Sequence, residues 1–118
     1  MIVDTSVWVD HLRRDDRRLA ALFHDGAAEL HPFVLCELAL GNLGRRDEIL
    51  GWLEALPSVE VAADAEVRYL IEERRLWGRG IGWIDAHLLA SALLGSTPLL
   101  TRDRALAAVA VELGVAGD

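Results

Sequence analysis

The segment Met1-Ile2-Val3-Asp4-Thr5-Ser6-Val7-Trp8 opens the chain with a short apolar run that a carboxylate ends. Residues 1–3 have the length and character of a buried strand. The side-chain oxygens of residues 4–6 suit the N-terminal cap of a helix, which would carry Val7, Trp8 and Leu12. The beginning of the chain therefore predicts a strand followed at once by a helix.

The remainder of the chain repeats this alternation. Further short strands are expected at residues 29–31, 59–61 and 98–100. Further helices are expected at residues 17–23, 32–40, 49–56, 63–76, 84–94 and 103–113, with a glycine-rich loop at 78–82 and at most a short final strand near residue 115. Short apolar strands between helices are typical of an α/β fold with a parallel sheet.

The composition indicates one folded domain. The chain has 118 residues, 53% of them hydrophobic and 26% charged, which supports a single core over residues 1–118 and argues against disorder. The one cysteine, Cys36, excludes a disulfide framework. Asp4 interrupts the first apolar run before a secretory signal could form, and no stretch approaches the roughly 20 apolar residues of a membrane span. We therefore expect a cytoplasmic protein without a membrane anchor.

The charge balance gives a mixed indication about nucleic-acid binding. The net charge of −7, from 19 acidic and 12 basic residues, argues against tight, sequence-independent binding, which needs a basic surface. All the basic residues are arginines, since lysine is absent. They cluster at residues 13–18, 45–46 and 74–79.

Two carboxylates follow predicted strands. Asp4 comes directly after the first strand, and Asp103 comes shortly after the strand at 98–100. Each precedes a predicted helix, so a helix N-cap is an alternative role for both. Ligands of open α/β sheets bind at the carboxyl ends of the strands, and this is where both side chains are expected.

Two more carboxylates interrupt apolar helix faces. Glu37 is the only charged residue between Phe33 and Leu40, although a solvent-facing position remains an alternative. Asp85 shares the spacing i, i+3, i+4, i+7 with Leu88, Leu89 and Ala92, the pattern of the buried face of a helix. Charges on such faces need compensation.

Four acids that converge on one cleft would suit a hard cation. Clustered carboxylates raise one another's pKa values unless a cation shares their site. Oxygen ligands alone favour Mg²⁺ or Mn²⁺ over zinc. Such an ion activates water and neutralises phosphate oxygens, so phosphodiester cleavage is the chemistry that these residues indicate.

These segments resemble the PIN-domain family, and especially the VapC toxins of VapBC toxin–antitoxin pairs. The first ten residues are similar to the opening of that family, and Leu99-Leu100-Thr101-Arg102-Asp103 to its last strand and acid. Leu35-Cys36-Glu37-Leu38 and Ile84-Asp85-Ala86-His87 resemble its two central acidic motifs. The order and spacing fit along essentially the whole chain.

The resemblance implies a PIN-like α/β/α sandwich around a central parallel sheet and a homodimer. It implies an Mg²⁺- or Mn²⁺-dependent endoribonuclease that leaves a 5′-phosphate and a 3′-hydroxyl on RNAs such as transfer or ribosomal RNA. A VapB-type antitoxin would place its tail in the active-site groove. Asp4, Asp85 and Asp103 match the metal ligands and Glu37 the fourth acid, while Ser6 and Thr101 match supporting hydroxyls.

Other residues have two interpretations. Arg102, Arg104, Arg13 and Arg14 can contact RNA phosphates, or can simply face solvent. His87 is expected at the surface or in core packing rather than in the site. The four tryptophans are expected to be core or dimer-contact residues rather than platforms for base stacking. They are Trp8, Trp52, Trp77 and Trp83.

Three other functions are compatible with parts of this pattern. Phosphoryl-transfer domains of the response-regulator or haloacid-dehalogenase classes use a lysine near the phosphate, and this chain has none. Asp4-Thr5-Ser6 also lacks the second aspartate of the dehalogenase pattern. A housekeeping PIN nuclease in RNA processing and a catalytically inert PIN binding module both remain as alternatives.

Overall fold

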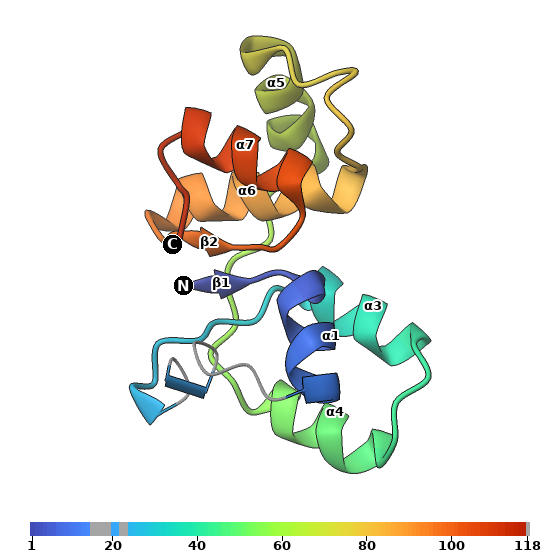
Figure 1. Cartoon of the computed structure of the whole chain (residues 1–118). Coiled ribbons are helices and arrows are strands. Elements are labelled where there is room, and N and C mark those ends of the chain that lie inside the picture. Colours follow the sequence, from blue (N-terminus) through green and yellow to red (C-terminus); the bar gives the residue numbers. More distant parts are fainter. Residues whose placement is uncertain (15–19, 22–23, 118) are drawn as a thin grey trace.

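The protein is a mixed α/β structure with a small parallel sheet (Figure 1). The computed structural model describes residues 1–14, 20–21 and 24–117. Within these residues it has two strands and six helices: β1 (Ile2–Val3), α1 (Thr5–Arg14), α3 (Pro32–Leu40), α4 (Arg46–Glu54), α5 (Asp64–Arg74), α6 (Trp83–Gly95), β2 (Leu99–Leu100) and α7 (Arg104–Glu112). The helix expected at 17–23 lies largely outside the described residues.

The sheet joins the two ends of the chain. β1 and β2 pair in parallel, with Ile2 opposite Leu99 and Val3 opposite Leu100. Isolated parallel bridges extend this sheet, because Glu29 pairs with Ile2 and Ala116 pairs with Leu99. A further bridge joins residues 30 and 58. The predicted parallel arrangement is therefore confirmed, and the strands that lead to Asp4 and Asp103 are direct neighbours.

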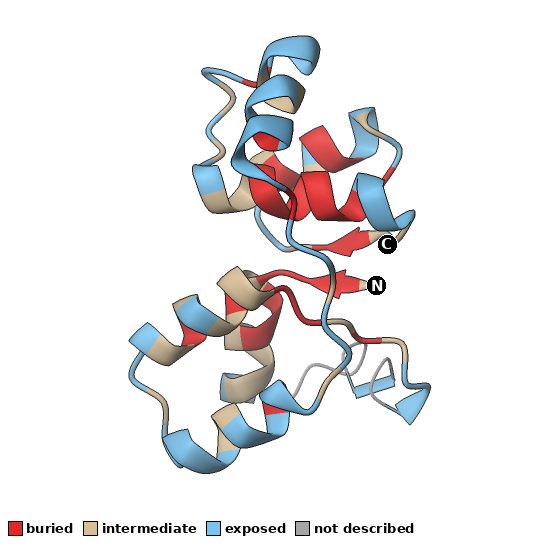
Figure 2. Cartoon of the chain, turned by 180° about the vertical axis from the view of Figure 1, so that it is seen from behind, coloured by how far each residue is buried: buried red, intermediate tan, exposed pale blue. Residues whose placement is uncertain are grey.

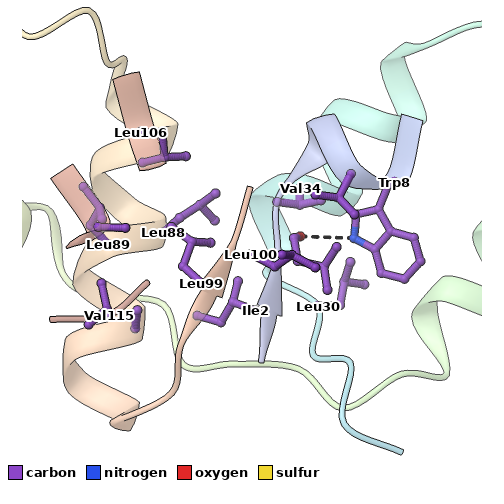
Figure 3. Packing of buried hydrophobic residues seen from close by; sticks show 14 of the residues in the cluster. Ile2, Trp8, Leu30, Val34, Leu88, Leu89, Leu99, Leu100, Leu106 and Val115 are labelled. Atoms are coloured by element: carbon purple, nitrogen blue, oxygen red, sulfur yellow. Dashed lines mark hydrogen bonds between the residues drawn. The ribbon is translucent and has the colours of Figure 1, made fainter. Parts of the chain in front are cut away.

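Apolar side chains fill the space on both sides of the strands. Leu88, Leu89 and Leu106, from α6 and α7, lie on one side, whereas Trp8 and Val34 lie on the other (Figure 3). The buried residues gather on the strands and on the helices beside them (Figure 2). α6 is buried from residue 86 to residue 92 without a break, because the sheet and the neighbouring helices enclose it.

The indole of Trp8 is anchored at the centre of this core. It is fully buried, and its Nε1–H donates to the carbonyl oxygen of Val3 at 3.1 Å. Core packing is therefore confirmed for Trp8. It is wrong for Trp52, Trp77 and Trp83, which are 45%, 60% and 42% exposed. Their contact with a second copy of the chain stays a prediction.

One predicted strand is wrong. At residues 59–61 only the beginning pairs, since the N–H of Val59 donates to the carbonyl oxygen of Leu30 at 3.0 Å and Val61 is 39% exposed. The alternation of Val59-Glu60-Val61 suits a strand, but this segment borders the sheet and the chain must turn into α5 three residues later. None of the helices in the described part of the chain has the length and apolar character to cross a membrane.

Helix boundaries follow local signals more closely than the apolar pattern does. α4 begins at Arg46 rather than 49, with Asp47 and Glu48 in its first turn, where acidic side chains favour a helix start. α5 ends at Arg74, because Arg75 adopts a left-handed conformation with φ of 53°. The other predicted helices within the described residues lie within about two residues of the observed ones.

Candidate active site

The four predicted acids come from elements that meet at one end of the sheet. The carboxyl ends of both strands and the first turn of α6 lie on the same side of the molecule, beside the start of α1 (Figure 1). Asp4 connects β1 to α1, Asp103 precedes α7, and Asp85 lies in the first turn of α6. Glu37 is in the second turn of α3.

Asp4 is the most deeply buried of these acids. Its side chain has 6% exposure, and its Oδ2 accepts hydrogen bonds of 2.7 Å from both Ser6 Oγ and Thr101 Oγ1. These hydroxyls are themselves fixed, because Ser6 Oγ accepts from the N–H of Arg102 and Thr101 Oγ1 from the N–H of Asp103, both at 3.0 Å. Two charge-assisted bonds compensate the burial of the carboxylate and link it to the segment that follows β2.

Asp103 has the helix-capping role that its sequence position allowed. Its Oδ1 accepts from the N–H of Leu106 at 3.1 Å, and the side chain is exposed. A carboxylate has two oxygens with several acceptor positions. The cap therefore fixes the direction of Asp103 and leaves its second oxygen for a ligand.

Glu37 faces the start of α1 rather than open solvent. It is half-buried, and its Oε1 accepts from Thr5 Oγ1 at 2.7 Å, so the solvent-facing alternative is wrong. Thr5 was predicted only as a capping residue and not as part of the site. The feature of the sequence that could have indicated Thr5 is its position directly after Asp4, where α1 begins.

Asp85 connects the four acids electrostatically. Its Oδ2 accepts from the N–H of Gly82 at 3.0 Å and closes the first turn of α6. Burial raises the pKa of Asp85, the bond from Gly82 lowers it, and the charges of Asp4, Asp103 and Glu37 each raise it further. The fold therefore brings the other three predicted acids within electrostatic range of Asp85.

The four acids offer the type of ligand atom that a hard cation needs, although no three of their side chains converge on one position in the described part of the chain. Within the described residues, no three carboxylate, histidine or cysteine side chains stand close enough to share one ion. Repulsion keeps bare carboxylates apart. Mg²⁺ is commonly held by one or two carboxylates, with waters and substrate phosphate completing its shell. Asp4, Glu37, Asp85 and Asp103 supply oxygen atoms only, which suits Mg²⁺ or Mn²⁺.

The predicted arginines divide into different environments. The guanidinium of Arg102 pairs with Asp10 at 3.3 Å between Nε and Oδ2, and Arg104 is exposed at the start of α7. Arg13 lines a cavity of about 480 Å³ together with Thr5 and Glu37. The side chain of Arg14 lies outside the described part of the structure. Of these arginines, Arg13 lines the same cavity as Glu37, whereas Arg102 and Arg104 flank Asp103 in the chain.

An aromatic cluster connects the starts of α3 and α6. His87 is fully buried, and its ring centroid lies 4.7 Å from that of Phe33 and 4.8 Å from that of Trp83. The predicted packing role of His87 is confirmed. His31 caps α3, since its Nδ1 accepts from the N–H of Phe33 at 3.0 Å. This cluster fixes the two helices that carry Glu37 and Asp85.

His31 makes the stability of the fold depend on pH. Burial, followed by the charge of His87, lowers the pKa of His31 to about 4 from 6.5, so the folded state favours the neutral ring. Its contribution is complete above about pH 6.5 and is lost as the pH falls toward 4. We expect the free energy of unfolding to drop by about 2 kcal/mol from this group between about pH 7.5 and pH 5.

Urea unfolding of the wild type and of His31→Asn at both pH values tests this. Asparagine does not titrate but can still cap the helix, so its stability curve should be flatter by that amount. Parallel curves for the two proteins would show that His31 does not titrate with a lowered pKa.

Comparison with known proteins identifies the family of the chain. The sequence profile of the PIN domain matches residues 1–112. The chain is also 50% identical, over 117 residues, to "Ribonuclease VapC32" of Mycobacterium tuberculosis, strain CDC 1551 / Oshkosh, and equally to the protein of that name in strain ATCC 25618 / H37Rv. In both cases the match covers 98% of this chain and 94% of the relative. The chain therefore belongs to the PIN-domain family and, within it, to the VapC ribonucleases.

Proposed function

We propose that this chain is a VapC-type endoribonuclease toxin that hydrolyses RNA phosphodiester bonds at the four-acid site with Mg²⁺ or Mn²⁺. The observation that carries the proposal is the coupling of Asp85 to Asp4, Asp103 and Glu37, acids from four separate elements. The family gives the class of activity, and this coupling supports the four acids as its proposed site. Asp4, Asp85 and Asp103 would hold the ion directly, and Glu37 through water or a second ion.

Hydrogen bonds from neighbouring hydroxyl groups would orient two of the acids, Asp4 and Glu37, for binding the ion. When bound, the ion neutralises phosphate charge and lowers the pKa of the attacking water. The hydroxyls of Ser6 and Thr101 both bond to Oδ2 of Asp4, which holds that carboxylate in one orientation. Thr5 does the same for Glu37. Such outer partners commonly change metal affinity or activity by about 10- to 100-fold.

The substrate and the antitoxin would share the cavity beside Glu37. This cavity of about 480 Å³ is lined by Thr5, Arg13, Glu37 and Arg45, among other residues. The arginines suit the phosphates of RNA, transfer or ribosomal RNA being the expected substrate. The carboxylate of Glu37 suits a basic side chain from the tail of a VapB-type antitoxin. Arg102, which pairs with Asp10, and Arg104 would contact phosphates farther along the strand.

Further features follow from membership of the family. We infer that residues 1–118 form a single PIN domain, that the helices and the sheet make an α/β/α sandwich, and that two copies associate as a homodimer. We also infer that the protein acts in the cytoplasm, where its RNA substrates and its antitoxin are made.

The chemistry of the product ends tests hydrolysis by water. Attack by an activated water should leave a 3′-hydroxyl on the upstream fragment and a 5′-phosphate on the downstream fragment of a short single-stranded RNA. The downstream fragment should therefore accept ligation at its 5′ end without a kinase, and the upstream fragment should accept extension at its 3′ end without a phosphatase. A 2′,3′-cyclic phosphate would instead mean that the ribose 2′-hydroxyl attacks, and would contradict the proposed role of the four acids.

A further inference from the structure

An aromatic pocket lies directly behind the first turn of α6. Trp77 and Trp83 both line a cavity of about 210 Å³, together with Leu76, Ile81 and Gly82 among other residues. This volume is smaller than the roughly 300–1,000 Å³ of sites for drug-sized ligands and suits one planar ring. Its walls come from the end of α5, the glycine-rich loop at 78–82 and the start of α6, a region seen at the upper right of Figure 1.

The pocket shares a residue with the proposed active site. Gly82 lines the cavity, and its N–H donates to Oδ2 of Asp85 at 3.0 Å. Trp83 is the next residue, at the beginning of α6. A group in this pocket would therefore lie close to a phosphate held at Asp85.

Both tryptophans are accessible to solvent, and Trp83 also contacts a buried ring. Trp77 is 60% exposed and Trp83 is 42% exposed. One edge of Trp83 rests on the buried ring of His87 at a centroid distance of 4.8 Å and an angle of 84°. Gly78 and Gly80 adopt positive φ values of 70° and 81°, a conformation that glycine tolerates without strain. These glycines therefore let the loop between the tryptophans turn without strain.

The charge beside the pocket suits a nucleic acid. In a chain of net charge −7, residues 74–83 contain three arginines and no acidic residue. Arg79 is bound by both carboxylate oxygens of Glu112. Arg74 and Arg75 are exposed, and within the described residues neither forms an ion pair. They adjoin the pocket in the chain, where a cationic side chain can contact a phosphate next to a stacked base.

We propose that this pocket binds a nucleobase of the RNA substrate beside the cleaved bond, with Trp77 and Trp83 as its stacking residues. The interpretation of these tryptophans as core residues is thereby replaced by a role in substrate selection. An aromatic ring next to the acids, a cavity for one ring and uncompensated arginines are the combination that single-stranded RNA requires. The proposal rests on the four-acid site as the place of cleavage.

The test is a double-mutant cycle between protein and RNA. The cleavage position of a short single-stranded RNA is mapped first, and the bases on its two sides are then removed in turn by abasic substitution. For the wild type with Mg²⁺, one abasic position should raise KM by about 5- to 150-fold. Trp83→Ala or Trp77→Ala should raise KM on the intact RNA similarly. Combined with that abasic RNA, the variants should add little more, because the two changes remove one contact.

Controls separate stacking from a general structural effect. Trp83→Phe retains an aromatic ring and should restore most of the affinity. Tyr69→Ala removes another exposed aromatic side chain, on α5 and 69% exposed, which does not line this pocket, and it should leave KM unchanged. Independent, additive effects of Trp83→Ala and every abasic substitution would overturn the proposal. So would unchanged RNA kinetics with a weakened antitoxin complex, since the pocket would then bind protein.

The experiments distinguish an error in the proposed nucleobase pocket from an error in the proposed active site. Asp85→Asn should abolish cleavage whatever the pocket does. If Asp85→Asn remains active, the four-acid site is wrong. If instead Asp85→Asn is inactive while Trp77 and Trp83 show no coupling to any base, only the nucleobase pocket is wrong.

Discussion

Asp4→Asn is expected to lower the rate of RNA cleavage by about a thousandfold, equivalent to about 4 kcal/mol of transition-state stabilisation. The substitution removes the negative charge that Asp4 would give to the ion. It keeps the shape of the side chain and leaves an oxygen that can accept from Ser6 and Thr101 as Oδ2 does now. The fold should therefore survive while the site loses a ligand.

The measurement is kcat/KM over a titration of Mg²⁺, with unfolding by urea as the control for folding. Asp85→Asn should behave similarly, and its stability should not fall, since the charge that burial and three other acids disfavour is removed. Thr101→Val, which removes the hydroxyl that donates to Asp4 and accepts from the N–H of Asp103, should cost about 10- to 100-fold. Wild-type cleavage should stop in excess chelator. Cleavage that persists in Asp4→Asn, or in chelator, would contradict metal-dependent hydrolysis at this site.

The sequence predicts the order of elements well because buried strands and helix caps have local signals. Pro32 at the start of α3 and Asp103 as the cap of α7 are observed where they are expected. The strand at 59–61 is wrong because its alternating pattern says nothing about partners. Only a bridge between residues 30 and 58 and the hydrogen bond from the N–H of Val59 to Leu30 form at its beginning. Strand pairing is a property of the assembled sheet, and a pattern of side chains along one segment does not determine it.

The four candidate acids could be picked out from the sequence, whereas their side-chain contacts could not. Glu37 and Asp85 stand out because charges are rare on apolar helix faces. The bond from Thr5 to Glu37 joins residues that are 32 positions apart, and no local pattern carries that information. The exposure of Trp77 and Trp83 could not be predicted from the sequence for a similar reason. A tryptophan in an apolar context normally indicates burial, and only the packed structure shows which rings remain uncovered.

Expression of the wild-type chain alone is expected to arrest growth of the host, and coexpression of a VapB-type antitoxin is expected to relieve the arrest. Cleavage of a transfer or ribosomal RNA stops translation even when each enzyme molecule turns over slowly. Relief has a physical basis in the acidic site. An arginine of the antitoxin tail can pair with carboxylates through two parallel hydrogen bonds and compete with the ion for Asp4, Glu37, Asp85 and Asp103.

The matched control is Asp4→Asn, which should be harmless at equal expression and should still bind the antitoxin through the remaining acids. Colony counts under induction measure the arrest, and copurification measures the complex. A gene for a small antitoxin directly upstream would supply the natural partner. If the wild type is folded, active on RNA and harmless, the toxin assignment is wrong and the housekeeping nuclease is correct, because the same four acids would then cleave RNA without an inhibitor. If the arrest occurs equally with Asp4→Asn, toxicity does not come from this site.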